Sequence, residues 1–183
     1  MISREDALRL LKQHLKNDKL VKHCLAVGAI MRAVAKELGE DENLWELVGL
    51  LHDIDYELVG KDLSKHGLVS AELLKDKLPE DALLAIKAHN ELTGVKADSR
   101  LALALRASDH ASGLIIATAL VMPHKKLEEV KPESLLRKFK QKDFARSIKR
   151  ERILSCEKMG IPLDKFLSIA LKALQDIHRD LGL

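Results

Sequence analysis

The sequence predicts an all-α fold, and both composition and patterning support that prediction. Of the 183 residues, 46% are hydrophobic and only 3% aromatic, so the core must consist mainly of Leu, Ala, Ile and Val. Leu and Ala are good helix formers, as are the abundant Lys and Glu. Nine Gly and four Pro provide little turn material for a protein of many strands. Apolar residues also recur at helical spacing through most of the chain.

Three helices are expected in the first part of the chain. Ser3, followed by Asp6, marks the start of the first, because a Ser hydroxyl satisfies free N–H groups in the first turn of a helix. The second helix covers about 18–38 and ends at Gly39, a residue type that favours helix C-termini. The third covers about 42–54.

Three more helices are expected in the middle of the chain, after a polar connection over 57–65. They cover about 66–77, 79–89 and 99–121. Pro79 suits the first turn of its helix, and Ser99 is a good capping residue. A loop over 91–98 separates the last two of these helices.

The C-terminal third is expected to form two or three further helices, divided by Gly160-Ile161-Pro162. A loop bracketed by Pro123 and Pro132 precedes them. The chain has no internal repeat, low-complexity segment or interdomain linker, so we expect a single domain. It comprises residues 1–183, with a helical core that includes the candidate site over about 18–115 and a C-terminal helical extension over about 123–183.

The net charge of +3 is unevenly distributed along the chain. Residues 122–152 contain 11 Lys or Arg against 5 Asp or Glu, so this basic segment carries +6 and the remainder −3. A segment of this kind can attract an anionic substrate or nucleic acid, whereas solvated helix faces would account for it equally well. We expect an anionic small molecule rather than nucleic acid as the partner.

The cysteines, the N-terminal residues and the apolar stretches of the sequence bear on where the protein is located in the cell. Cys24 and Cys156 lie far apart in apolar helical patterns and form no CxxC pair, as expected for free thiols in a reducing environment. The first residues have no signal-peptide hydrophobic region. The longest apolar stretch, 114–122, is too short to span a bilayer. We therefore expect a cytoplasmic protein without membrane contact, and a homo-oligomer is compatible with the sequence.

The segment GLLHDIDYE, 49–57, places His52 and Asp53 at the end of the most apolar predicted helix. His23, His89 and Asp109 interrupt the apolar faces of other helices in the same way. A single such residue is usually a core side chain hydrogen-bonded to backbone. Imidazoles and carboxylates on four or five successive helices are better explained together, by a divalent metal site.

The order and spacing of these residues resemble the motif of a known family. His23, then His52-Asp53, then Asp109, at this helical spacing, is similar to the signature of the HD-domain superfamily of metal-dependent phosphohydrolases. The segments KHGLVSAELL (65–74) and AIKAHN (85–90) resemble the two additional histidine motifs of its dinuclear branches. Those branches include di-iron dinucleoside-polyphosphate hydrolases and cyclic-dinucleotide phosphodiesterases. The resemblance covers about 18–115.

The resemblance implies one or two divalent metal ions per chain, with Fe, Mn, Ni, Co and Zn all compatible with His and carboxylate ligands. Asp53 would bridge two ions, the second of them held by His66 and His89. The complete implied set of metal ligands is His23, His52, Asp53, His66, His89 and Asp109.

The implied activity is that of an enzyme that uses a metal-activated water to cleave a phosphoester of a nucleotide, dinucleotide or related small phosphorylated molecule. Asp53, Asp55 and His110 are the expected catalytic residues, with His110 beside Asp109 as a proton source for the leaving oxygen. Basic residues near in sequence are further candidates for that leaving oxygen: Lys87, Arg106, Lys125 and Lys126.

The chain departs from its relatives directly after the HD pair. Many relatives have HDIGK or HDxxK, in which the lysine helps to hold phosphate, whereas here Asp55 and Tyr56 replace that Gly-Lys pair. The mononuclear nucleotidase branch has a glutamate where this chain has Tyr56. Asp55 is expected either to orient a ligand histidine or a water, or to cap the helix end.

Two other functions remain open from the sequence. Some relatives with the same six ligands are di-iron oxygenases, which use O₂ to oxidise a substrate carbon. The chain could also be a non-catalytic metal- or nucleotide-binding module whose basic segment docks a partner.

Overall fold

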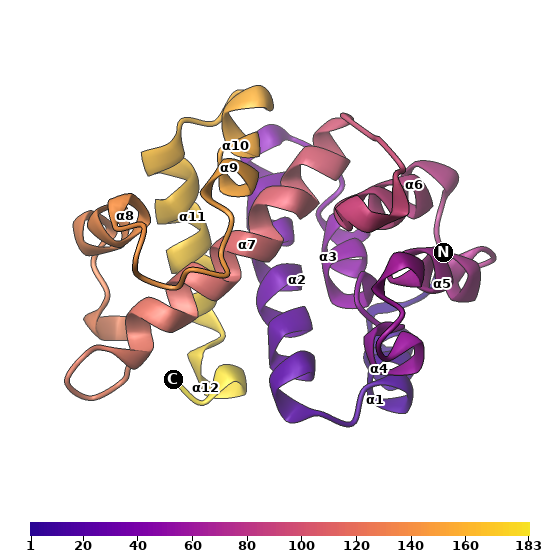
Figure 1. Ribbon diagram of the computed structural model, residues 1–183, viewed down its shortest axis with the longest axis horizontal. Coiled ribbons are helices and arrows are strands. Elements are labelled where there is room, and N and C mark those ends of the chain that lie inside the picture. Colours follow the sequence, from indigo (N-terminus) through magenta and orange to yellow (C-terminus); the bar gives the residue numbers. More distant parts are fainter.

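Two 21-residue helices, α2 (Asp18–Leu38) and α7 (Arg100–Leu120), form the centre of the fold and contact each other. In the computed structural model, which describes residues 1–183, α7 runs between a group of N-terminal helices and a group of C-terminal helices (Figure 1). The structure contains no strand, which confirms the predicted all-α class. None of its helices combines the length and apolar character needed to cross a membrane.

The first helix begins where predicted, and the second has the predicted bounds. The Ser3 hydroxyl accepts the Asp6 N–H at the start of α1 (Arg4–His14). Gly39, with φ of +70°, ends α2 in the left-handed conformation that glycine adopts without strain.

The third helix, α3 (Glu42–Leu51), is shorter than predicted. Residues 52–55 form turns, followed by the single-turn helix α4 (Tyr56–Val59) within the segment predicted as a polar connection. The Asp55 carboxylate accepts backbone N–H groups from Gly67 and Ser70, and these contacts turn the chain away from the axis of α3.

The helix predicted over 66–77 is also shorter, because α5 covers only Leu68–Leu74. His66 precedes it, at the end of a 3₁₀ turn over Leu63–Lys65. Gly67, with φ of +90°, separates the two, since this backbone conformation is incompatible with a continuous helix. Pro79 is the N-cap residue of α6 (Glu80–His89) and so lies just before its first turn.

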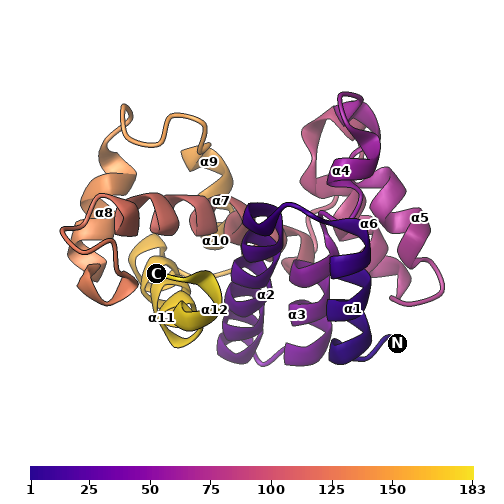
Figure 2. The same ribbon diagram turned by 90° about the horizontal axis from the view of Figure 1, so that it is seen from below.

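The C-terminal part contains five helices rather than two or three, three of them single turns. They are α8 (Pro132–Lys140), α9 (Arg150–Ile153), α10 (Ser155–Lys158), α11 (Leu163–Asp176) and α12 (His178–Leu181). Helix α11 packs against α2, α7 and α8 (Figure 2). Forty-nine buried hydrophobic residues, from Ala7 to Leu181, form one cluster.

Helices α2 and α3 approach each other closely at a pair of glycines. A Cβ atom added at Gly49 would lie 2.7 Å from the Gly28 Cα and 2.8 Å from its backbone nitrogen. These are backbone atoms of a neighbouring helix, so they cannot move aside individually. The contact brings the ends of α2 and α3 that carry His23 and His52 together, with their ring centroids 5.3 Å apart.

We expect Gly49→Ala to lower the free energy of unfolding by about 1–3 kcal/mol, because the added methyl group overpacks the α2–α3 contact. Urea unfolding followed by circular dichroism measures this change. Gly113→Ala in α7 is the matched control, since its Cβ would meet only the flexible end of the Ile148 side chain. Equal stability of Gly49→Ala and the wild type would contradict the close approach of the two helices.

Candidate metal centre

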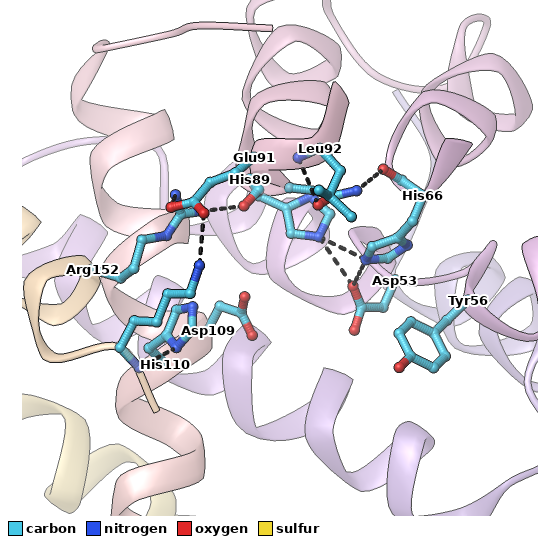
Figure 3. Close-up of a pocket in the computed structure, with 11 residues that line it drawn as sticks. Asp53, Tyr56, His66, His89, Glu91, Leu92, Asp109, His110 and Arg152 are labelled. Carbon is cyan, nitrogen blue, oxygen red and sulfur yellow. Dashed lines mark hydrogen bonds and ion pairs between the residues drawn. The ribbon is translucent and has the colours of Figure 1, made fainter. Parts of the chain in front are cut away.

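The six predicted ligands come together from five parts of the fold. His23 lies on α2, His52 and Asp53 directly after α3, and His66 just before α5. His89 is the last residue of α6, and Asp109 lies in the middle of α7. Figure 3 shows the part of this cluster that faces the cavity.

The carboxylate of Asp53 is at the centre of the cluster. Its Oδ1 atom lies 3.2 Å from His52 Nε2, 3.1 Å from His66 Nε2 and 3.2 Å from His89 Nε2. Its Oδ2 atom lies 3.5 Å from His23 Nε2. One buried carboxylate therefore faces all four imidazoles.

Asp109 provides the second carboxylate. Its Oδ1 atom lies 3.1 Å from His23 Nε2 and 4.0 Å from His52 Nε2. Two groups of three potential ligand atoms result, and within each group all atoms lie within 4.8 Å of one another. The groups are His23, His52 and Asp109, and His52, Asp53 and His89.

All four imidazoles have their Nε2 atoms directed toward the carboxylates and their Nδ1 atoms bonded to other groups. The Nδ1 partners are the Gly49 carbonyl for His52 (2.7 Å), the Ile86 carbonyl for His89 (2.5 Å), the Ser112 hydroxyl for His23 (3.3 Å) and Asp55 Oδ1 for His66 (2.7 Å). Donation from Nδ1 fixes the tautomer whose Nε2 carries a free lone pair, which is the form that binds metal.

One atom of the cluster has no hydrogen-bond partner. His52 is fully buried, and its Nε2 atom has no hydrogen-bond partner. The ring proton is on Nδ1, which donates to the Gly49 carbonyl, so the Nε2 lone pair faces Asp53 Oδ1 at 3.2 Å with no proton between them. An unsatisfied buried polar atom costs about 1–3 kcal/mol, and a divalent cation held between the imidazoles and the carboxylates would remove that cost. The residues present therefore fit a divalent metal ion.

Two of the histidines that contact carboxylates, His23 and His66, have raised pKa values. Burial opposes a positive charge on His23, but the hydrogen bond and charge of Asp109, with the charge of Asp53, outweigh it and raise the pKa to about 9. For His66, burial is again outweighed, here by hydrogen bonds to Asp53 and Asp55, and the pKa rises to about 10.

The pKa values of His52, Asp53 and Asp109 are also shifted, and all three shifts are downward. Burial lowers the pKa of His52 to about 4. Burial would raise the pKa values of Asp53 and Asp109, but the surrounding imidazoles outweigh it and hold both values below the usual range. The carboxylates are thus ionised at neutral pH, as metal binding requires.

Asp55 does not line the cavity, unlike most of the other predicted site residues. It is fully buried, and its Oδ1 accepts the Nδ1–H of His66 at 2.7 Å. Its Oδ2 accepts the N–H groups of Gly67 and Ser70, both at 2.8 Å. Asp55 therefore orients His66 and shapes the turn, and it has no direct access to a substrate.

A cavity of about 400 Å³ opens onto the cluster. It is lined by Asp53, Tyr56, His66, His89, Asn90, Glu91, Leu92, Asp109, His110, Lys149 and Arg152. His110 is thus brought to the site, with its Nδ1 atom accepting the Lys149 N–H at 3.3 Å. Burial lowers the pKa of His110. The basic residues proposed from proximity in sequence, Lys87, Arg106, Lys125 and Lys126, do not line this cavity.

Several cavity residues were not predicted as site residues, namely Asn90, Glu91, Leu92, Lys149 and Arg152. The positive balance of the basic segment was the only sequence signal for the last two. Another cation of that segment, Arg150, instead donates to six backbone carbonyls between Lys138 and Ile148 and so stabilises the loop before α9.

Comparisons with known proteins agree with this cluster. The family model described as HD domain matches residues 20–117, more than half of the chain. The chain is 36% identical over 99 residues to a protein named Ribonuclease Y from Lawsonia intracellularis, and 35% identical over 103 residues to one from Oleidesulfovibrio alaskensis. These matches cover 51% and 53% of this chain but only 18% of each relative. No solved structure gives a significant match.

We expect metal binding at pH 7 to release protons, up to two per chain. With pKa values of about 9 and 10, His23 and His66 are protonated at neutral pH in the metal-free protein, and both must become neutral to bind metal. The apparent affinity for Mn²⁺ should therefore rise with pH until about pH 10, the higher of the two pKa values. Calorimetric titrations in buffers of different ionisation enthalpy count the protons. Affinity that does not change between pH 6 and 8 would contradict the pairing described above.

We expect Asp55→Asn to lower the affinity for metal by about 10- to 100-fold, because the amide cannot reproduce the acceptor contacts that fix His66. Elemental analysis after dialysis against graded metal concentrations measures the loss. The matched control is Asp76→Asn, which removes the same charge at an exposed position. Unaltered metal content in Asp55→Asn would show that the orientation of His66 does not depend on this carboxylate.

Proposed function

The chain belongs to the HD-domain family, and from this premise we propose that it is a metal-dependent phosphohydrolase. HD domains typically bind divalent metal ions and catalyse hydrolysis, so the general activity follows from the family. We propose further that two ions bind per chain, the first to His23, His52, Asp53 and Asp109. Asp53 would bridge to the second, held also by His66 and His89.

The single observation that carries the proposal is the convergence of four imidazole Nε2 atoms on two ionised carboxylates, with one Nε2 atom buried and unpaired. Bound divalent ions supply Lewis acidity, which makes water nucleophilic near neutral pH and neutralises charge on the phosphoryl oxygens. The protein's own residues have two tasks. The groups bonded to the Nδ1 atoms fix the imidazole tautomers, and the imidazoles keep Asp53 and Asp109 ionised.

Other cavity residues fit roles in binding and proton transfer. His110 lies at the cavity wall with its Nδ1 atom occupied by the Lys149 N–H, so Nε2 is the atom available to give a proton to a leaving oxygen. Tyr56 packs edge-on against the His66 ring, at a centroid distance of 5.2 Å, on the Asp53 side of the cavity (Figure 3). Its phenol is suited to contact the substrate there.

We propose a nucleotide or dinucleotide as the substrate, since an open cavity lined mainly by polar and charged residues fits a phosphorylated small molecule. A phosphodiester of RNA is the second candidate, because the curated relatives carry the name Ribonuclease Y. This chain corresponds to only 18% of their length, so their whole activity is not carried over. We also propose a cytoplasmic location, supported by two buried cysteines without a disulfide.

The test combines metal analysis with turnover. We expect protein purified without chelator to contain about two metal equivalents and to lose them in Asp53→Ala, because this carboxylate contacts all the imidazoles. We expect Mn²⁺-loaded wild type to hydrolyse bis-p-nitrophenyl phosphate, nucleotides or short RNA, and the variant to lose at least about 100-fold in rate.

Each alternative function has its own outcome. Full metal content with tight nucleotide binding and no turnover would indicate a binding module. Substrate-dependent O₂ uptake with an electron paramagnetic resonance signal of mixed-valent iron would indicate an oxygenase. Protein that takes up no metal on reconstitution would contradict all the metal-dependent functions.

A further inference from the structure

The chain at the start of α9 brings two cations, Lys149 and Arg152, to the cavity wall. Arg152 lies on the side of the cavity opposite Tyr56 (Figure 3). Lys149 Nζ lies 2.7 Å from Glu91 Oε2, and Arg152 Nη1 lies 2.9 Å from Glu91 Oε1. Lys149 immediately precedes α9 and Arg152 lies within it. Both therefore lie outside residues 20–117, the part of the chain that matches the HD-domain model.

The two cations differ in how firmly they are held. Arg152 is buried, its side chain is 10% exposed, and its guanidinium also donates to the His89 carbonyl. Its Nε atom is buried without a hydrogen-bond partner. The Lys149 ammonium is half exposed and contacts only Glu91. Arg152 is thus a fixed cation, whereas Lys149 can exchange one anionic partner for another.

Glu91 is the exchangeable anion in this arrangement. Its side chain is 52% exposed, and both of its carboxylate oxygens are occupied by the cations. One carboxylate facing two cations leaves a local excess of positive charge. This excess lies next to a cluster whose ionised carboxylates would otherwise repel a phosphorylated substrate.

We propose that Lys149 and Arg152 form a binding subsite for a second phosphate group, adjacent in the substrate to the one that reacts. Glu91 occupies the subsite in the free protein, and the substrate phosphate replaces it on Lys149. This inference rests on the proposed phosphohydrolase function. Lys149 and Arg152 are the only Lys or Arg side chains that line the cavity, so they are the cations available to this phosphate.

The subsite implies a class of substrate. A simple phosphomonoester contains only the phosphate that reacts. A nucleotide chain with a terminal phosphate contains a second phosphate next to its phosphodiester, and this second group can bind the subsite. Oxygen atoms of a phosphate form charge-assisted hydrogen bonds with both ammonium and guanidinium groups. We therefore assign the site a 5′-phosphorylated dinucleotide or oligonucleotide in preference to a lone phosphomonoester.

The test measures binding separately from turnover. Calorimetry compares 5′-phosphorylated diadenylate, pApA, with unphosphorylated ApA on Mn²⁺-loaded protein, both with a hydrolysis-resistant phosphorothioate linkage. We expect wild type to bind pApA about tenfold more tightly, the size expected for one charge-assisted hydrogen bond. Lys149→Met should remove this preference, and Lys142→Met should keep it, because Lys142 is an exposed lysine of the same basic segment.

Glu91→Gln is a second variant, and we expect it to strengthen the binding of pApA, whereas Lys149→Met should weaken it. Glu91→Gln keeps the size of the side chain but releases Lys149, so it should increase affinity for pApA severalfold. A purely structural role for Glu91 would instead weaken binding or leave it unaltered. The hexanucleotide pA₆ identifies the source of the phosphate: tighter binding than pApA indicates RNA, and equal or weaker binding indicates a dinucleotide.

The outcomes separate this inference from the proposed function. Equal affinity of wild type for pApA and ApA would overturn the subsite, even if both unmodified compounds are hydrolysed. A tenfold preference that Lys149→Met abolishes would support the subsite, even if the protein hydrolyses neither compound. Equal loss of the preference in Lys142→Met would overturn it, because only general charge would then be responsible.

Discussion

The buried carboxylate of Asp53 is the group around which the rest of the site is organised. A carboxylate at the end of the most apolar helix is unfavourable unless donors or cations surround it. His52, His66 and His89 approach its Oδ1 atom, and His23 approaches its Oδ2 atom. These residues come from three helices and a turn, so the charge can be satisfied only when those parts of the chain have assembled around it. Burial of the charge therefore couples the site to the fold.

The helices that carry these residues are positioned by the apolar core. The glycines at the α2–α3 crossing allow the backbones to approach closely enough for the His23 and His52 rings to be neighbours. Around this contact, the cluster of buried hydrophobic residues extends from the first helix to the last. The C-terminal helices share that core, and for this reason α9 can deliver its side chains to the cavity in a fixed position.

The site has two electrostatic parts that come from different regions of the chain. The region that matches the HD-domain model provides the imidazoles and carboxylates, a set suited to divalent cations. The basic segment, through Lys149 and Arg152, provides positive charge at the cavity wall. The first part is common to a family that typically catalyses hydrolysis, and the second belongs to this chain's C-terminal extension. We infer that the C-terminal extension contributes to the choice of substrate.

The sequence by itself determined the helical class, the caps at Ser3 and Ser99, and the glycine that ends α2, because these depend on interactions between near neighbours. Polar residues within apolar helix faces indicated a metal site, and the full ligand set was implied by the resemblance to the HD-domain superfamily. Tertiary structure alone decided the partners of those residues. Asp55 bonds to His66 through a turn, and Glu91 pairs with Lys149 and Arg152, which lie 58 and 61 residues away. Such pairs leave no periodic signal in the sequence, because the turn after α3 forms the first pair and the packing of the C-terminal helices forms the others.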